Sequence, residues 1–435
     1  MEKCYFAHFK CCRLDHLLFV IYLVLFSWMV SRIPFFRHSG LSPAQLIILF
    51  LLKLCAGIFY GWIGVWYGGT AHMLDTWVYY YDSLDETALL LQDPVRFLTT
   101  LADSGYADYG GFFSSRSSYW NDLQTYLMVK LTAIFNVFSL NNYYINVIFY
   151  SFISFFGVMA FYRLMLHLFP QRRVEVLMGS FFIPSFLYWT SGIHKEGLIF
   201  LGIMLVLYPL VFKTKAGRLS LWMALSVLLG VAITVLLRNY LLVLLLTALA
   251  AWLLAARMPR RPLLAYLTVY TAAALLFFNL HHLSPTLNLP QRVVEKQEDF
   301  GKLQGASAVP LQMLKPTPGS FVAVAPQALF NTVLRPAPPD VKHLLSFAAT
   351  AENMLLLLTA LLFFLFPARR VKDPNLVLFC LFFSFTTLLT IGYTVNFLGA
   401  TVRYRSIILP LVLTPVIAQT NWGLIWSKTN RMIKK

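Results

Sequence analysis

Apolar runs of membrane-spanning length recur along this chain, and they constrain its fold more than any other feature. A helix that crosses a bilayer needs roughly 20 consecutive apolar residues. Hydrophobic residues make up 59% of the 435 residues and charged residues only 12%, whereas about a quarter of a soluble domain is charged. The predicted spans are Ala44–Gly68, Asn142–Leu168, Val174–Ser191, Gly197–Phe212, Ser220–Leu237, Asn239–Ala256, Leu263–Leu280, Ser346–Phe366, Asn375–Val395 and Ser406–Ala418. The sequence therefore predicts an all-α polytopic membrane protein with about 10–11 transmembrane helices.

Two further apolar segments are ambiguous. Leu17–Val30 has only about 14 residues, short of a perpendicular span, so residues 1–43 are predicted to form an N-terminal anchor or an interfacial helix. Leu123–Leu140 carries leucines on one helical face, with polar side chains opposite and Lys130 in the middle. A segment with that pattern is predicted to lie in the membrane interface rather than to cross.

The basic residues predict the topology, because short cytoplasmic loops are enriched in Lys and Arg. Loops and tail that we assign to the cytoplasm hold Arg172, Arg173, Lys213, Lys215, Arg218, Arg257, Arg260, Arg261, Arg369, Arg370, Lys372, Lys428, Arg431, Lys434 and Lys435. The net charge of +17 is explained by these loops, so we expect no nucleic-acid partner. The transmembrane domain is predicted to be 44–420, with outer loops at 69–141 and 281–345 and a basic cytoplasmic tail at 421–435.

Acidic residues cluster in the first outer loop. Eight of the 18 acidic residues lie between positions 75 and 122. Carboxylates beside a bilayer are costly, which marks this loop as a candidate site. Most of them would simply keep the loop hydrated, and we single out Asp75, with Asp82 as a secondary candidate.

Cations at predicted span ends are the other signal. His194, Lys195 and Glu196 begin a helix after a Pro-containing span and a small-residue turn, where a helix N-terminus can bind an anion. Arg238 interrupts two apolar runs and needs a partner or water. Arg403 and Arg405 lie two residues apart before the last span and could clamp a phosphate. The structural alternatives are a capped hairpin, an inter-span turn and lipid-headgroup anchoring, respectively.

The layout resembles the type C glycosyltransferases, the polytopic enzymes that use polyprenyl-phosphate-linked sugars. Three short motifs carry the resemblance to bacterial envelope-polysaccharide members: the Asp and Tyr residues of the first outer loop, Tyr188-Trp189-Thr190-Ser191-Gly192 with Lys195-Glu196, and Val402-Arg403-Tyr404-Arg405. The resemblance implies that Asp75 is the catalytic base. Because cations stabilise the charge of a departing phosphate, we expect the lipid phosphate to be bound by His194, Lys195, Glu196, Arg238, Arg403 and Arg405. Asp75 is followed by Thr76-Trp77, without the second acidic motif common in that family, and whether a divalent metal takes part is left open.

The function expected from this resemblance is sugar transfer from a polyprenyl-phosphate donor to a glycan, lipid or protein acceptor, at the outer or periplasmic face of the plasma (inner) membrane. One alternative is an O-antigen polymerase or ligase that acts on a lipid-diphosphate glycan through residues of the 281–345 loop. Another is a flippase or transporter. It would need charges in mid-membrane, for which Lys53, Arg163 and Glu352 are the candidates, although all three lie near helix ends or could snorkel.

Overall fold

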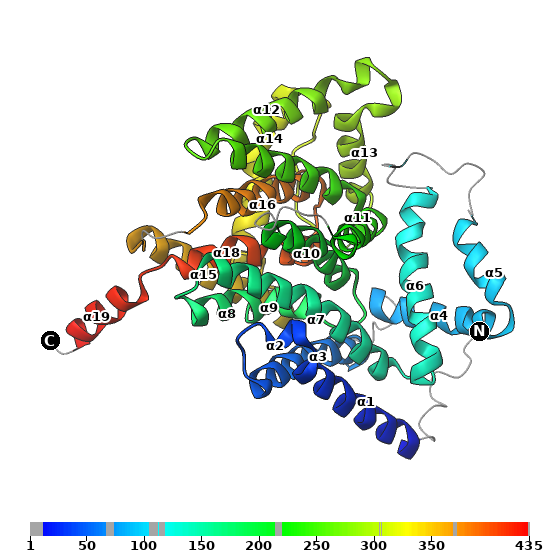
Figure 1. Cartoon of the computed structure of the whole chain (residues 1–435). Helices are drawn as coiled ribbons and strands as arrows, with labels where there is room; N and C mark the ends of the chain where they lie inside the picture. Colours follow the sequence, from blue (N-terminus) through cyan, green and yellow to red (C-terminus); the bar gives the residue numbers. More distant parts are fainter. Residues whose placement is uncertain are drawn as a thin grey trace. The chain divides into compact units, whose positions relative to one another are not determined.

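The computed structural model describes residues 12–66, 74–103, 112, 118–213, 220–303, 305, 307–368 and 372–433, and the regular elements in these ranges are helices (Figure 1). The central part of the first outer loop, Lys215, Arg218, Arg369, Arg370, Lys434 and Lys435 lie outside the described residues. The described residues are therefore mainly those of the apolar helices.

Within these ranges, eight helices are long and apolar enough to cross a membrane, and a ninth crossing is possible if one bent pair counts as a span. The eight helices are α1 (Cys12–Arg32), α3 (Pro43–Trp66), α7 (Tyr143–Leu168), α10 (Lys195–Lys213), α11 (Leu221–Arg257), α12 (Pro262–Asn279), α15 (Leu344–Leu365) and α16 (Pro374–Thr394). The bent pair is α17 (Leu398–Ser406) and α18 (Leu409–Ala418), which meet at 63°. The polytopic all-α class is confirmed, with fewer candidate spans than predicted.

Two local features explain the smaller number. The predicted span Val174–Ser191 is split into α8 (Arg173–Phe181) and α9 (Pro184–Trp189), because a proline lacks the N–H that a continuous helix requires. Two other predicted spans join in α11, whose backbone leaves helical geometry at Arg238 (φ −162°, ψ 79°). A straight helix of 37 residues would be about 55 Å long, well beyond the roughly 30 Å of a bilayer core.

The chain divides into two compact units. The first comprises Met1–Ser104, Asp122–Met159 and Leu187–Leu201, and the second comprises Gly105–Asn121, Ala160–Phe186 and Gly202–Lys435. The short helices are α2 (Pro34–Arg37), α5 (Pro94–Thr99), η2 (Thr100–Ala102), η3 (Leu280–His282), η4 (Pro285–Leu287), the π-helical η5 (Phe330–Leu334) and η6 (Pro338–Asp340).

In the first unit, α6 (Tyr119–Ser139) is not among the candidate spans, in line with the sequence analysis. Its polar face, however, turns toward protein and not toward water. Asn136 donates to Ser83 Oγ (2.8 Å) on α4 (Asp75–Gln92) and accepts from Asn146 (2.6 Å) on α7. Lys130 is also buried, 2.9 Å from Glu86 and 2.6 Å from the carbonyl of Phe97. The polar face of α6 therefore serves to form hydrogen bonds and an ion pair with α4, α5 and α7.

In the second unit, the predicted outer loop 281–345 is largely ordered. It contains α13 (Leu289–Gly301) and α14 (Pro318–Leu329), which lie beside α12 and α16 (Figure 1). Val294, Leu314, Phe321 and Val324 form its core, against Phe277, Phe278 and Tyr393. Buried Gln297 donates to the carbonyls of Gln312 (3.1 Å) and Tyr393 (2.8 Å) and accepts from Leu314 N (2.8 Å). The segment is thus a cap hydrogen-bonded to the C-terminal end of α16.

The N-terminal end of α16 lies beside the loops that their basic residues predict to be cytoplasmic. Asn375 donates to the carbonyl of Trp252 (3.1 Å) at the end of α11. An antiparallel bridge pairs Pro367 with Thr420, so the start of the basic tail lies against the end of α15. In the second unit, these predicted cytoplasmic connections and the 281–345 cap therefore lie at opposite ends of α16. The orientation of α16 relative to the cytoplasm stays a prediction.

Candidate functional site

The first unit links Asp75 and Lys195, two residues singled out independently from the sequence. Asp75 is the first residue of α4, and Lys195 is the first residue of α10. Tyr79, one turn after Asp75, donates to Asp75 Oδ2 at 3.5 Å. Lys195 Nζ lies 5.4 Å from the centroid of the Tyr79 ring and donates to Gln124 Oε1 at 3.3 Å. An acid, a phenol, a lysine and an amide thus form one chain of contacts.

Burial divides the residues of this cluster into two kinds. Asp75, Lys195 and Gln124 are half-buried, whereas Tyr79 is buried. A cation near the face of an aromatic ring is attracted by the ring's quadrupole. Tyr79 therefore contacts both the acid and the lysine.

The turn before α10 fixes the position of Lys195. Gly192 has a positive φ of 74°, and its backbone contacts Gly57 on α3, where a Cβ would meet Gly192 N at 2.7 Å. Four residues before Gly57, buried Lys53 donates to the carbonyl of Thr190 at 2.5 Å and to Ser191 Oγ at 3.4 Å. One face of α3 thus holds both sides of the turn.

His194 and Glu196 lie in the interior and do not join Lys195 at the rim. Both side chains have 0% exposure, and His194 Nδ1 lies 3.4 Å from Glu196 Oε2. The rings of Tyr60 and Trp189 enclose His194, with centroids 4.2 and 5.3 Å away. Of the three residues predicted to bind phosphate here, only Lys195 is not fully buried. The reason is that successive side chains at the start of a helix point in different directions.

Asp82 lies on the same face of α4 as Asp75, two turns further along, or about 10 Å by helix geometry. Its side chain is exposed. Partial burial and the neighbouring charge of Asp85 raise the pKa of Asp82 above its usual value. The structure gives it no hydrogen-bonded link to Lys195, so it does not belong to the cluster.

A second group of predicted residues gathers in the second unit. Arg238 lies at the backbone break of α11, and its guanidinium carbon is 4.3 Å from the ring centroid of Tyr404 on α17. The next residue, Asn239, donates to the carbonyl of Phe112 at 2.6 Å and accepts from Tyr240 N at 2.8 Å. The break therefore brings a half-buried arginine and the start of a helical segment together beside α17.

Arg403 and Arg405 do not form the predicted pair. On a helix, residues two apart point about 200° from each other, and both lie within α17. Arg405 is 1% exposed and donates to the carbonyls of Thr332 (2.6 Å) and Arg335 (2.7 Å) and to Asn353 Oδ1 (3.3 Å). Arg405 thus anchors the end of the 281–345 segment, and only Arg403 is half-buried and reachable.

The expectation that Lys53 and Glu352 could snorkel to the interface is wrong. Lys53 is 1% and Glu352 7% exposed. Glu352 accepts from Ser185 N (2.9 Å) and Ser185 Oγ (2.7 Å). Both charges are therefore hydrogen-bonded inside the protein.

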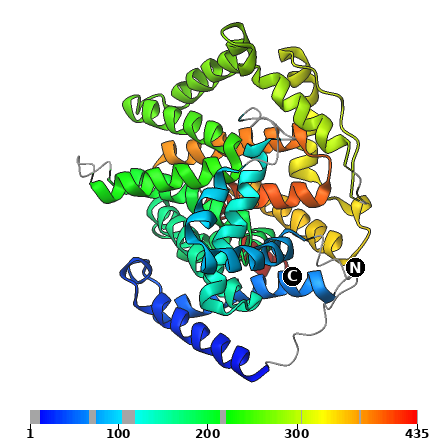
Figure 2. The ribbon, with the colours of Figure 1, turned by 90° about the vertical axis from the view of Figure 1, so that its right-hand side faces the viewer.

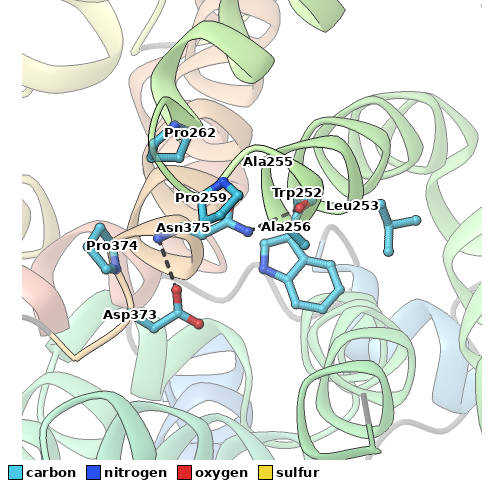
Figure 3. A pocket seen from close by; sticks show the side chains of 9 residues that line it. All are labelled: Trp252, Leu253, Ala255, Ala256, Pro259, Pro262, Asp373, Pro374 and Asn375. Carbon is cyan, nitrogen blue, oxygen red and sulfur yellow. Dashed lines mark hydrogen bonds between the residues drawn. The ribbon is translucent and has the colours of Figure 1, made fainter. Parts of the chain in front are cut away.

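A pocket of ≈ 350 Å³ lies at the N-terminal end of α16, whereas the 281–345 cap is bonded to its C-terminal end. Figure 3 shows the residues that line the pocket. Trp252 of α11, Pro262 of α12 and Asp373, which caps α16, line it. The carboxylate of Asp373 already accepts from Asn375 N (3.0 Å) and Leu376 N (3.3 Å). None of the residues predicted for the site lines this pocket.

Metal ligands do not gather anywhere in the described part of the chain: no group of three or more His, Cys, Asp or Glu side chains comes together there. Sequence reasoning missed Tyr79 and Gln124, and it considered Lys53 only as a mid-membrane charge for transport. The spacing of Tyr79 one turn after Asp75 was a usable signal, whereas the contacts of Gln124 and Lys53 depend on the tertiary fold.

Comparison with known proteins finds no matching family model, no matching curated protein and no matching solved structure.

Proposed function

We propose that this multi-pass membrane protein is a glycosyltransferase that moves a sugar from a polyprenyl-phosphate donor to a glycan, lipid or protein acceptor. The observation that carries the proposal is the link from Asp75 through Tyr79 to Lys195. It unites a base and a cation from helix starts 120 positions apart (195 − 75), in a chain with few acidic residues.

The transfer reaction requires two charged groups that act on opposite sides of one carbon. The acceptor hydroxyl loses its proton to the carboxylate of Asp75 as its oxygen bonds to the anomeric carbon of the sugar. The bond from that carbon to the phosphate oxygen breaks, and the electron pair leaves with the lipid phosphate. Lys195 stabilises the growing negative charge on that phosphate, and Gln124 orients the ammonium group.

Arg238 and Arg403 are additional phosphate-binding candidates within the second unit, and the proposal does not require them. His194, Glu196 and Arg405 take positioning roles, because each side chain is 1% exposed or less. We propose the plasma membrane and its outer face from the loop charges, since the 69–141 segment is poor in Lys and Arg.

The polymerase or ligase alternative requires free cationic groups in the 281–345 segment. There, the guanidinium of Arg335 is bound by both carboxylate oxygens of Asp340. This hydrogen bonding raises the pKa of Arg335 and lowers that of Asp340. Because Arg335 already has a bidentate anionic partner, a new phosphate could bind there only if this pair broke.

The test uses membranes from cells that lack the protein, complemented with wild type or a variant, and measures transfer of labelled sugar from polyprenyl phosphate to endogenous acceptor. Asp75→Asn should lower the rate by about 10²–10⁴-fold, the usual contribution of a general base. Lys195→Gln should also lower it, with partial recovery in Lys195→Arg. Asp103→Asn, an exposed acid of the same loop, is the matched control. Full activity of Asp75→Asn together with loss in Arg335→Ala would favour the polymerase or ligase alternative.

A further inference from the structure

The C-terminal helix α19 (Trp422–Ile433) leaves the second unit as an exposed element (Figure 1). Its start is fixed firmly. Ala368 N donates to the carbonyl of Gln419 (2.6 Å), Asn421 N donates to that of Phe366 (2.8 Å), and Asn421 Oδ1 accepts from Leu424 N (3.1 Å). The helix therefore begins at a defined place, a few residues after the last predicted span.

Large apolar side chains on α19 face solvent. Trp426 is 70% and Leu424 is 42% exposed. At the adjoining end of α15, Phe364 is 77% and Leu365 is 59% exposed. Such residues at the end of a membrane-spanning helix are expected to contact lipid, and the bridge between Pro367 and Thr420 places the start of α19 beside them.

The charge of this segment has one sign. Residues 421–435 include Lys428, Arg431, Lys434 and Lys435 and no acidic residue. On a helical projection, Trp422, Ile425 and Trp426 fall on one side, whereas Lys428 and Leu424 fall on the other. Lys428 Nζ lies 4.8 Å from the ring centroid of Phe366, which keeps this charge near the end of α15.

We propose that α19 lies in the plane of the membrane and binds the headgroups of anionic phospholipids in the leaflet at the basic end of the second unit. Trp and Ile side chains insert at the interface, and the basic side chains contact lipid phosphates. The positive charge and the position beside the end of α15 favour this partner over another protein. The proposal is independent of the glycosyltransferase assignment.

The test measures hydrogen exchange of the α19 amides in the full-length protein, reconstituted in nanodiscs of phosphatidylcholine alone or of phosphatidylcholine and phosphatidylglycerol in equal parts. Protection should be higher with phosphatidylglycerol, and high salt should remove the difference. Lys428→Gln with Arg431→Gln should lower protection roughly 25-fold in the anionic discs, since each basic residue contributes roughly fivefold near such a surface.

Two controls keep the result interpretable. Lys302→Gln, on α13's side of the unit, should leave the lipid effect unchanged, and Lys428→Arg with Arg431→Lys should retain it. The amides of α16 report the folded bundle and should not change. Equal protection of α19 in both lipids, or an unchanged lipid effect in the double Gln variant, would overturn the proposal.

Discussion

Replacement of Arg405 by Gln tests whether this arginine supports the fold or serves the ligand. Its guanidinium makes three hydrogen bonds, to two carbonyls and one amide oxygen of the segment 332–353. Each bond from a charged donor contributes about 1.5–3 kcal/mol, but the substitution also removes the cost of burying the charge. Since disruption of a buried ionic network typically costs 3–5 kcal/mol, we expect a loss of about 3–5 kcal/mol.

The assay is thermal unfolding in detergent at a fixed scan rate, followed by intrinsic fluorescence. At roughly 2 °C per kcal/mol, Arg405→Gln should lower the apparent midpoint by about 6–10 °C and should speed proteolysis within 281–345. Arg403→Gln, two positions earlier on α17, is the matched control and should shift it by less than about 2 °C. Equal shifts in the two variants would refute the assignment of Arg405 to the fold.

Three further predictions concern other buried or paired groups. Lys53→Met should speed hydrogen exchange in the turn before α10 by about tenfold or more, although global stability need not fall, because burial of the charge is itself costly; unchanged exchange would contradict this. Gln297→Leu leaves two carbonyls and one N–H without their partner and should cost about 2–4 kcal/mol of stability. New protease cleavage beside α13 should report this loss, whereas replacement of the exposed neighbour, Glu298→Leu, should cause no new cleavage. The pKa of Asp340 is lowered by the hydrogen bond from Arg335, so its stabilisation is present above its unfolded pKa of about 3.9 and is lost as pH falls through the lower folded value. The acid-induced loss of protection in the 281–345 segment, measured relative to the intrinsic exchange rate at each pH, should be smaller in Asp340→Asn, and an unchanged loss would contradict it.

Hydropathy predicted most of the fold, because a bilayer leaves few alternatives to apolar helices. The Arg238 position was correctly identified as an interruption between two apolar segments. The predicted span through Pro184 was not found as one helix, since a window of apolar residues does not register the missing backbone donor. The Leu17–Val30 run lies within a helix of spanning length, α1, because flanking polar residues extend it.

The site was predictable only for residues whose direction the sequence determines. Asp75 and Lys195 are each the first residue of a helix, so their side chains lie at a helix end whatever the rest of the fold does. The direction of the Arg405 side chain depended on whether residues 398–406 are helical. The spacing of Arg403 and Arg405 does not reveal this. The buried roles of Lys53 and Glu352 depended on acceptors far away in the sequence.

The most direct test of the central claim is thiol labelling of single cysteines at positions 75 and 195, in a variant without native cysteines, with a membrane-impermeant reagent on intact cells. We predict that both positions are labelled from outside. Labelling of position 75 only from the cytoplasm and of position 195 only from outside would show that no shared site exists, and it would contradict the proposed chemistry.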